Sequence, residues 1–295
     1  MLDRERQFLL EAKRSGTMNR TAIRGGGVGL AVVMWMLPNL VMALPPGTKD
    51  PVAIMQAMND RDVGNRATAT MTIVVEDAAG RTRTRVLKTR TLKSKDGKIT
   101  WQRMRFDKPA DVRGTTLLTH DFEDGAKQDD QWLYLPSLKK PTRIASSEKS
   151  GSFMGTDLSY SDMTQKDTDD YDLSLLKESV EVGGEDCWLI EGRPRTKKAK
   201  SETGYVKSKF WISKRLLAPM QAKMWVRDGK KLKYLKFSDY KAFKGADGTP
   251  FWVVTRIRAW TKRNKKTEST TELHMTQLKY GQPGVTRADF APSRL

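Results

Sequence analysis

The sequence has few residues suited to redox, metal or catalytic chemistry. Its 295 residues include one cysteine, Cys187, and two histidines, His120 and His274. A single thiol excludes an intramolecular disulfide, and neither histidine has a second ligand at the spacing of a metal site. The chain has no Gly-x-Ser-x-Gly turn, phosphate-binding loop or His-Glu-x-x-His pair. We therefore expect no metal, no cofactor and no enzymatic activity.

Long apolar runs are also scarce, and the clearest one lies near the N-terminus. It spans residues 28–41, follows Arg20 and Arg24, is interrupted by Pro38 and precedes Ala43. A basic stretch, a short apolar run and a small-residue cleavage site are the parts of a secretory signal peptide. The run is short for a membrane span, so an uncleaved anchor is the less favoured alternative.

The predicted cleavage after Ala43 divides the chain into two parts. Residues 1–43 form an N-terminal extension and cleaved signal peptide, with either Met1 or Met18 as the start. Residues 44–295 form a single exported domain, which we expect in the periplasm. Residue 44 is a leucine rather than a cysteine, so the protein is not expected to be a lipoprotein itself.

The excess of basic residues indicates the surfaces that attract the chain. Lysine and arginine number 54 against 35 acidic residues, a formal net charge of +19. Such a charge favours anionic membrane surfaces, although a plain solvated surface is an equal alternative. A polyanion-binding module is a weaker alternative, and we predict no nucleic-acid partner.

After one helix, the chain has the two-residue periodicity of β-strands. Asp50 and Pro51 form a helix start, and apolar residues then recur at helical spacing until about residue 62. Alternating apolar and polar residues, separated by turn dipeptides, follow to the C-terminus. The predicted strands are 67–76, 82–94, 99–106, 115–122, 131–135, 141–144, 171–182, 187–193, 205–213, 219–227, 231–243, 250–262 and 267–280.

This pattern predicts a mainly β fold. About 11–13 strands without alternating helices favour a curved antiparallel sheet or open half-barrel, with an N-terminal helix and a helical or loop lid. The connections 145–170 and 194–204 are long for hairpins, and long loops are often functional. The second is basic, and we expect it to be solvated.

The apolar face of several strands is rich in methionine and aromatic residues. Met220, Ala222 and Met224, for example, alternate along one segment. A curved sheet this long has more inner face than one helix and one loop fill, so an apolar cavity is expected beside the ordinary core. Methionine suits such a cavity because its side chain is flexible and polarisable.

Residues 129–163 carry the most specific pattern. They contain Asp129-Asp-Gln-Trp-Leu-Tyr-Leu-Pro-Ser-Leu-Lys-Lys-Pro-Thr-Arg-Ile-Ala145, followed by Lys149-Ser-Gly-Ser-Phe-Met-Gly-Thr-Asp-Leu-Ser-Tyr-Ser-Asp-Met163. This stretch resembles the outer membrane lipoprotein-sorting protein family, the LolA-like periplasmic carriers, in their longer branch. The resemblance extends over roughly residues 50–290.

The resemblance implies an open β-barrel with a lid and an apolar cavity for acyl chains. It implies a non-enzymatic periplasmic carrier that moves a lipoprotein or a lipid towards the outer membrane. It also implies an inner-membrane transporter of the resistance-nodulation-division (RND) type as a possible partner. An accessory subunit of such an RND/MMPL-type lipid exporter is the alternative.

Within this frame, two groups of residues are candidates for the site. Arg113 and Arg143 are candidate latches that hold a lid closed through backbone carbonyls, and Phe153, Met154 and Gly155 form a candidate gate, or else anchor the loop on the core. The candidate lipid-binding residues are Trp132, Tyr134, Phe153, Met154, Phe210, Trp211, Met220, Met224 and Trp225.

Overall fold

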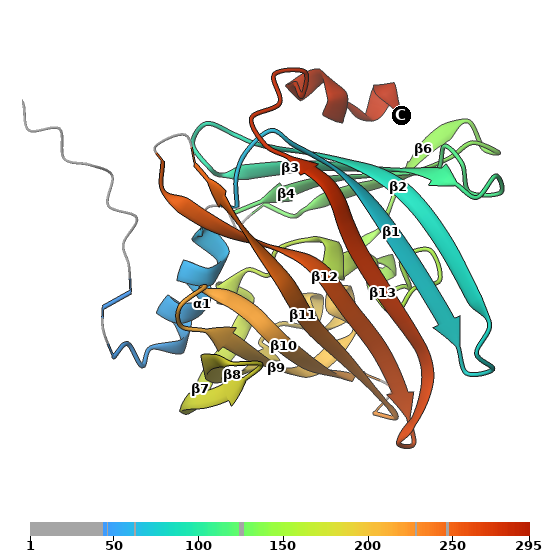
Figure 1. Cartoon of the computed structure of the whole chain (residues 1–295). Helices are drawn as coiled ribbons and strands as arrows, with labels where there is room; N and C mark the ends of the chain where they lie inside the picture. Colours follow the sequence, from blue (N-terminus) through green and yellow to red (C-terminus); the bar gives the residue numbers. More distant parts are fainter. Residues whose placement is uncertain (1–43, 46, 62, 124–126, 228, 246–247) are drawn as a thin grey trace, which may run out of the picture. The chain divides into compact units, whose positions relative to one another are not determined.

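One antiparallel sheet curves through the whole of the described chain without closing (Figure 1). The computed structural model describes residues 44–295 except 46, 62, 124–126, 228 and 246–247. In these residues 13 strands pair in the order β6-β5-β4-β3-β2-β1-β13-β12-β11-β10-β9-β8-β7. The predicted fold class is thereby confirmed, whereas the predicted signal peptide and its cleavage site lie outside the described residues.

The elements follow the predicted segments closely along the chain. Helix α1 (Pro51–Asp60) comes first and α2 (Lys197–Thr203) lies between β8 and β9. The strands are β1 (Ala67–Asp77), β2 (Thr82–Lys93), β3 (Ile99–Lys108), β4 (Thr116–Phe122), β5 (Asp130–Leu135), β6 (Lys140–Arg143), β7 (Tyr171–Val182), β8 (Glu185–Pro194), β9 (Tyr205–Ser213), β10 (Ala218–Val226), β11 (Lys231–Lys244), β12 (Pro250–Arg263) and β13 (Lys266–Lys279).

Helix α1 begins where its capping residues predict. The Asp50 carboxylate accepts a hydrogen bond from the Val52 N–H (2.9 Å), and Pro51 occupies the first helical position. Ile54 and Met55 are buried on one side of the helix and pack on an apolar cluster from β8 and β9. The helix therefore covers one end of the sheet.

A long connection, residues 145–170, lies against the inner face of the sheet; we call it the lid segment. It contains three short 3₁₀ helices, Ser146–Glu148, Tyr160–Met163 and Thr168–Asp170. Phe153 and Leu158 are buried in the same cluster as residues from β1 to β4 and from β9 to β13. The lid segment thus joins strands that are far apart in the sequence.

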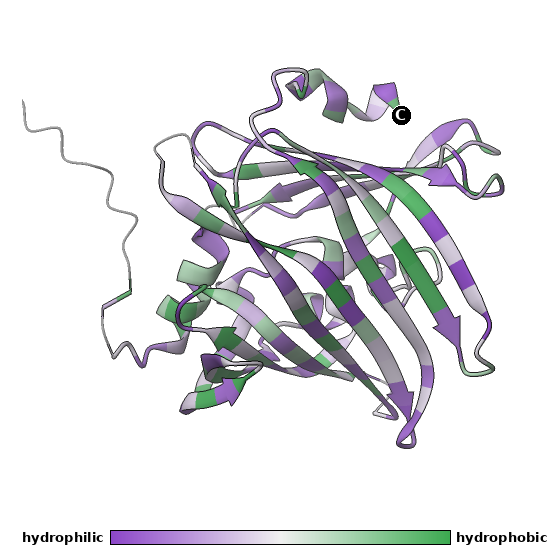
Figure 2. Cartoon of the chain, viewed as in Figure 1, coloured by the Kyte–Doolittle hydropathy of each residue, from purple (hydrophilic) through white to green (hydrophobic). Residues whose placement is uncertain are grey.

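The outer face of β2 to β5 is covered by the C-terminal residues. Phe290 and Val285 are fully buried against Leu92 and Leu118. Leu118 therefore points outward, while its neighbour Leu117 belongs to the inner cluster. Both faces of this part of the sheet bury apolar residues, and apolar and polar bands alternate along most strands (Figure 2).

The basic residues of the connection 194–204 are exposed, as expected, but the connection contains the helix α2 rather than only a loop. Thr196 caps the helix by accepting a hydrogen bond from the Ala199 N–H (3.0 Å). Gly204 ends it with φ +70°, and a Cβ there would lie 2.9 Å from Ser150 in the lid segment. Short polar helices have little hydrophobic periodicity, so composition alone did not reveal this one.

Candidate functional site

An apolar cavity of about 500 Å³ lies between the inner face of the sheet and its cover. The cover consists of α1 and the second half of the lid segment, residues 158–168. Strands β1, β3, β7 and β9 to β13 supply the opposite wall. This volume is within the usual range of small-molecule binding sites.

Methionine is the commonest apolar residue in the cavity wall. The side chains come from α1, from the lid segment and from four strands, and they are Met55, Met58, Met71, Met104, Met163, Met224 and Met275. Unbranched thioether side chains adapt to ligands of variable shape at little cost in packing. The wall suits a flexible hydrocarbon chain better than a rigid polar molecule.

Three of the predicted binding residues line this cavity: Phe153, Phe210 and Met224. Phe153 is 1% exposed and contacts the rings of Phe106 and Tyr160 at centroid distances of 6.0 and 5.8 Å. Met224 is 3% exposed and lies on β10. Their role in binding stays a prediction, which their position supports.

The other predicted binding residues do not line the cavity. Trp132 lies on the outer face, beside His120 (ring centroids 4.8 Å apart), and packs on the C-terminal cluster. Tyr134, two residues along the same strand, shares that face. The C-terminal residues already cover the outer face around Trp132, and neither Trp132 nor Tyr134 lines the apolar cavity.

The remaining aromatic candidates also point away from the interior. The ammonium of Lys207 lies 4.1 Å from the Trp225 ring centroid, as in a solvated sheet face. Trp211 pairs with Gln221 of β10, and both side chains lie on the opposite face of the sheet from Ala222 and Met224. Strand parity, rather than residue type, separates these residues from the cavity.

The two candidate methionines outside the wall lie at irregular backbone. Met220 falls at the register shift between β9 and β10, beside Gly183. Met154 has φ +50° and packs on the inner cluster.

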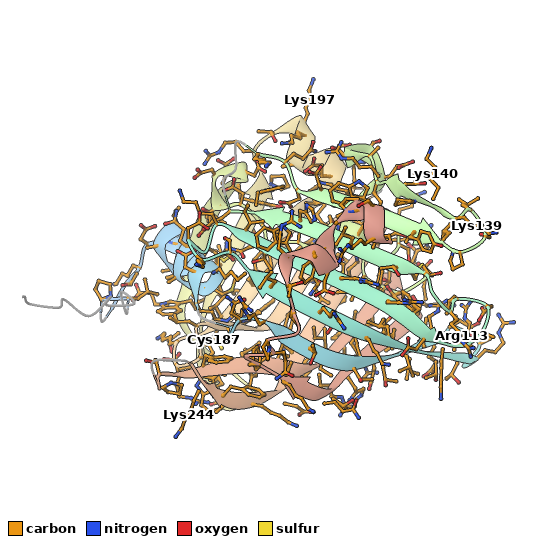
Figure 3. All side chains as sticks on the ribbon, turned by 90° about the horizontal axis from the view of Figure 1, so that it is seen from above. Arg113, Lys139, Lys140, Cys187, Lys197 and Lys244 are labelled. Atoms are coloured by element: carbon orange, nitrogen blue, oxygen red, sulfur yellow. The ribbon has the colours of Figure 1, made fainter. Side chains whose placement is uncertain are left out.

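The predicted latches form their hydrogen bonds elsewhere. Arg113 Nε donates to the Asp107 carbonyl (3.2 Å) within the β3–β4 connection, and its side chain projects at the edge of the molecule (Figure 3). Arg143 Nε donates to the carboxylate of Asp130 (2.8 Å). Within the described residues neither arginine bonds the lid segment.

A different arginine makes the contact that was expected of a latch. Arg85 Nη1 donates to the carbonyl oxygen of Met154 in the lid segment, at 2.5 Å. Arg85 shares a strand face with Leu87, which is fully buried. The two-residue periodicity places Arg85 on the same inner face as Leu87. The alternating arginines that precede it are, however, more typical of a solvated strand face.

Asp157 fixes the middle of the lid segment to the sheet. Its carboxylate accepts hydrogen bonds from Thr261 (2.6 Å), Ser269 (2.6 Å) and Thr271 (2.8 Å), and its N–H donates to Thr271 (2.9 Å). All of this lies on β12 and β13. A buried carboxylate that is satisfied by hydroxyl groups orients the loop without any cation.

A buried ion pair fixes the next part of the lid segment. Lys233 Nζ donates to Asp162 (2.9 Å) and to the hydroxyl of Tyr205 (2.6 Å), and both charged side chains are 10% exposed. Burial alone would raise the pKa of Asp162, but Lys233 and Lys166 hold it below its usual range. The stability from ionised Asp162 is therefore present above about pH 4 and is lost as pH falls through the lowered pKa.

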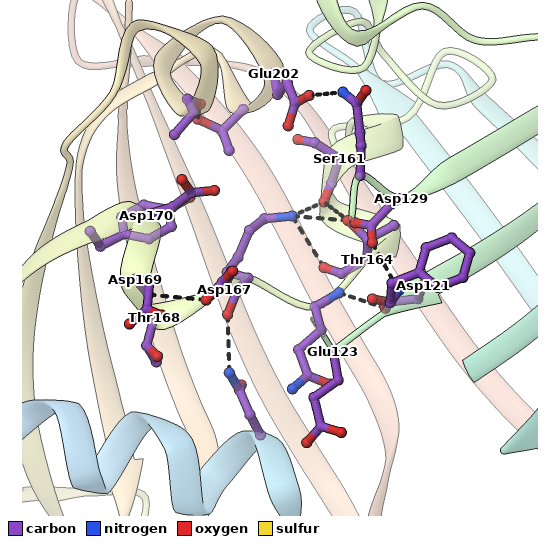
Figure 4. A pocket seen from close by; sticks show the side chains of 18 of the residues that line it. Asp121, Glu123, Asp129, Ser161, Thr164, Asp167, Thr168, Asp169, Asp170 and Glu202 are labelled. Atoms are coloured by element: carbon purple, nitrogen blue, oxygen red, sulfur yellow. Dashed lines mark hydrogen bonds between the residues drawn. The ribbon is translucent and has the colours of Figure 1, made fainter. Parts of the chain in front are cut away.

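A polar pocket of about 390 Å³ adjoins the end of the lid segment (Figure 4). Asp121 accepts a hydrogen bond from the Gln165 N–H (2.8 Å), and Asn59 of α1 donates to the Lys166 carbonyl (3.0 Å). Lys166 Nζ donates to backbone carbonyls within the lid segment. This segment therefore separates the polar pocket from the apolar cavity, and both pockets share residues 164–168.

Protonation of Asp121 couples this end of the lid segment to pH. Burial, and then the neighbouring carboxylate of Asp129, raise the pKa of Asp121 to about 7. A raised carboxyl pKa gives stability that is complete below the unfolded pKa and is lost as pH rises through the folded one. We therefore expect the free energy of unfolding to fall from pH 4 to pH 8. The pocket is open to water, which screens the charge of Asp121 and limits this fall to about 1–2 kcal/mol.

Urea denaturation as a function of pH measures this loss. Asp121→Asn should reduce the slope, because the raised pKa of Asp129 remains, and the exposed Asp172→Asn should leave the slope unchanged. Equal slopes in the wild-type protein and in Asp121→Asn would contradict the assignment.

Groups for other chemistry are few in the described residues. Cys187 is buried, and burial raises the pKa of its thiol to about 11. In the part of the chain that the structure describes, no three His, Cys, Asp or Glu side chains gather as metal ligands. Among the helices described, none has the length and apolar character needed to cross a membrane.

Comparison with known proteins relates the chain to solved structures. A family model described as "-like: Uncharacterized protein" matches residues 99–295. The outer membrane lipoprotein-sorting protein domain from Vibrio parahaemolyticus is 31% identical, with a TM-score of 0.71, over 83% of this chain and 97% of that one. A DUF1329 family protein from Desulfovibrio piger is 32% identical, with a TM-score of 0.72, over 83% and 99% of the two chains.

A more distant structure shares the fold. A LolA superfamily protein from Nitrosomonas europaea is 18% identical, with a TM-score of 0.60, over 84% of this chain and 100% of that one. No curated protein matches the chain.

Proposed function

Because the chain belongs to the outer membrane lipoprotein-sorting protein family, we propose that it carries the acyl chains of a lipid or lipoprotein through the periplasm. The observation that carries the proposal is the apolar cavity of about 500 Å³ between sheet and cover. Phe153, Phe210 and Met224 would contact the hydrocarbon.

The cavity is a physically reasonable host for an acyl chain. Each methylene transferred from water to an apolar interior gains about 0.8 kcal/mol, so a long chain needs an enclosed site to cross an aqueous space. Part of the cavity wall belongs to α1 and the lid segment rather than to the sheet. Release then requires the cover to move, which its polar contacts to the sheet permit without breaking strand pairing.

Export and partners complete the proposal. The predicted signal peptide, residues 1–43, would deliver the mature chain to the periplasm. An RND-type transporter of the inner membrane is the proposed donor, and an anionic membrane is the proposed surface of encounter. A cluster of basic residues supports the second partner. It consists of Lys88, Arg90, Arg103 and Arg105 on the outer face of β2 and β3, and of Arg113 in the β3–β4 connection.

Lipid analysis of the native protein tests the carrier function. The mature chain, purified from its periplasmic fraction without detergent, should release lipid on solvent extraction, and mass spectrometry should detect it. The delipidated protein should then bind a fluorescent fatty acid with one-site saturation. A protein that never holds lipid and binds no acyl probe is not a carrier.

A further inference from the structure

Arg61 is the one arginine that lines the apolar cavity among the described residues. It follows α1 directly and lines the cavity together with Met58 and Val63. Val63 is 39% exposed although it is part of the wall. Arg61 therefore lies beside a residue of the wall that solvent reaches, where an amphiphile would keep its headgroup.

In the part of the chain that the structure describes, the charge of Arg61 has no anionic partner. Its Nη1 donates to the carbonyl oxygen of Met58, at 2.5 Å, which satisfies one end group of α1. Its Nε is buried and has no hydrogen-bond partner. Within the described residues no carboxylate lies within 4.0 Å of the guanidinium. Burial lowers the pKa of Arg61, which means that its surroundings disfavour the charge.

The other charged groups in the cavity wall are already satisfied. Asp162 binds Lys233 and Tyr205, and the Asp167 carboxylate accepts from the Asp169 N–H (3.0 Å). Lys166 donates to carbonyls of the lid segment. Among the described residues of this wall, Arg61 is thus the cation that has a buried donor free for a ligand. A guanidinium removed from water is stabilised strongly by an anion that it can hydrogen-bond.

We propose that the cavity takes an amphiphile with an anionic headgroup, a carboxylate or a phosphate, which Arg61 binds while the chain lies among the methionines. The inference rests on the proposed carrier function and narrows its cargo. An acyl chain joined to a protein by an amide or ester has no anion at that end. The site therefore favours a free anionic lipid over a lipoprotein anchor.

Three probes with the same hydrocarbon chain test the headgroup: hexadecanoate, hexadecyl phosphate and hexadecanol. The delipidated protein should bind at least one anion about ten- to a hundredfold more tightly than the alcohol, the usual gain from a charge-assisted hydrogen bond. A preference for one anion distinguishes a fatty acid from a phospholipid-type headgroup. The measurement is displacement of a fluorescent acyl probe, at a pH where both acids are ionised.

Matched variants assign the preference to Arg61. Arg61→Gln should weaken anion binding to the level of hexadecanol and leave hexadecanol binding unchanged, while Arg61→Lys should keep part of the preference. Arg193→Gln removes the same charge from an exposed position on β8 and should keep all of it. Circular dichroism and urea denaturation verify that each variant is folded.

Each other outcome overturns a defined part of the inference. Equal affinity of the wild-type protein for all three probes refutes the anionic cargo and leaves the carrier function standing. Equal loss of anion and alcohol binding in Arg61→Gln shows that Arg61 acts only through the position of α1, which also refutes the inference. No binding of any probe refutes the carrier function itself.

Discussion

Met224→Glu is expected to weaken acyl-chain binding by at least about a hundredfold while leaving the β-sheet circular dichroism signal intact. Met224 is 3% exposed and lines the cavity from β10. A carboxylate at this position keeps its charge only if water enters the cavity, and a hydrocarbon chain then has to displace that water. Titration of the delipidated variant with a fluorescent fatty acid measures the loss.

Two further variants separate this effect from unfolding. Gln221→Glu adds the same carboxylate to the opposite face of β10 and should bind the probe normally. Ala222→Phe fills the cavity without adding charge and should also reduce binding, because Ala222 is part of the wall. Unaltered binding in both Met224→Glu and Ala222→Phe would exclude this cavity as the lipid site.

Lys233→Met is expected to lower the free energy of unfolding by about 3–5 kcal/mol, the usual cost of breaking a buried ion pair from one side. The substitution leaves the Asp162 carboxylate, 10% exposed, without the cation that holds its pKa down. The lid segment should therefore lose its hold on β11 before the sheet unfolds. Urea denaturation measures the first effect, and binding of a hydrophobic dye below the unfolding transition measures the second.

The control for Lys233→Met lies three residues along the same strand. Lys236 is exposed on β11, and Lys236→Met should change the free energy of unfolding by less than about 0.5 kcal/mol. Adding Asp162→Asn to Lys233→Met should recover part of the loss, since the neutral amide needs no cation. A cost below about 1 kcal/mol for Lys233→Met alone would show that the pair does not hold the lid segment.

The candidate site shows how far local patterns reach. The methionine-rich strand faces predicted an apolar cavity, and methionines do line a cavity on the inner face of the sheet. The choice of Trp132 and Trp225 followed residue type, and both lie on the other face of the sheet. Arg61 drew no attention in the sequence, since a lone arginine after a helix is ordinary. Only the packing of α1 on the sheet shows that, among the described residues, it has no anionic partner.

Local sequence patterns and tertiary packing thus determined different features of this chain. Alternation of apolar and polar residues, turn dipeptides and the Asp50-Pro51 cap were enough for the strands, the first helix and the family, because each depends on neighbours within a few positions. Which face is hollow depended on packing: the lid segment fills part of the inner face, and Phe290 fills the outer face of β2 to β5. A pattern with a period of two cannot tell these faces apart, since residues distant in sequence cover each of them.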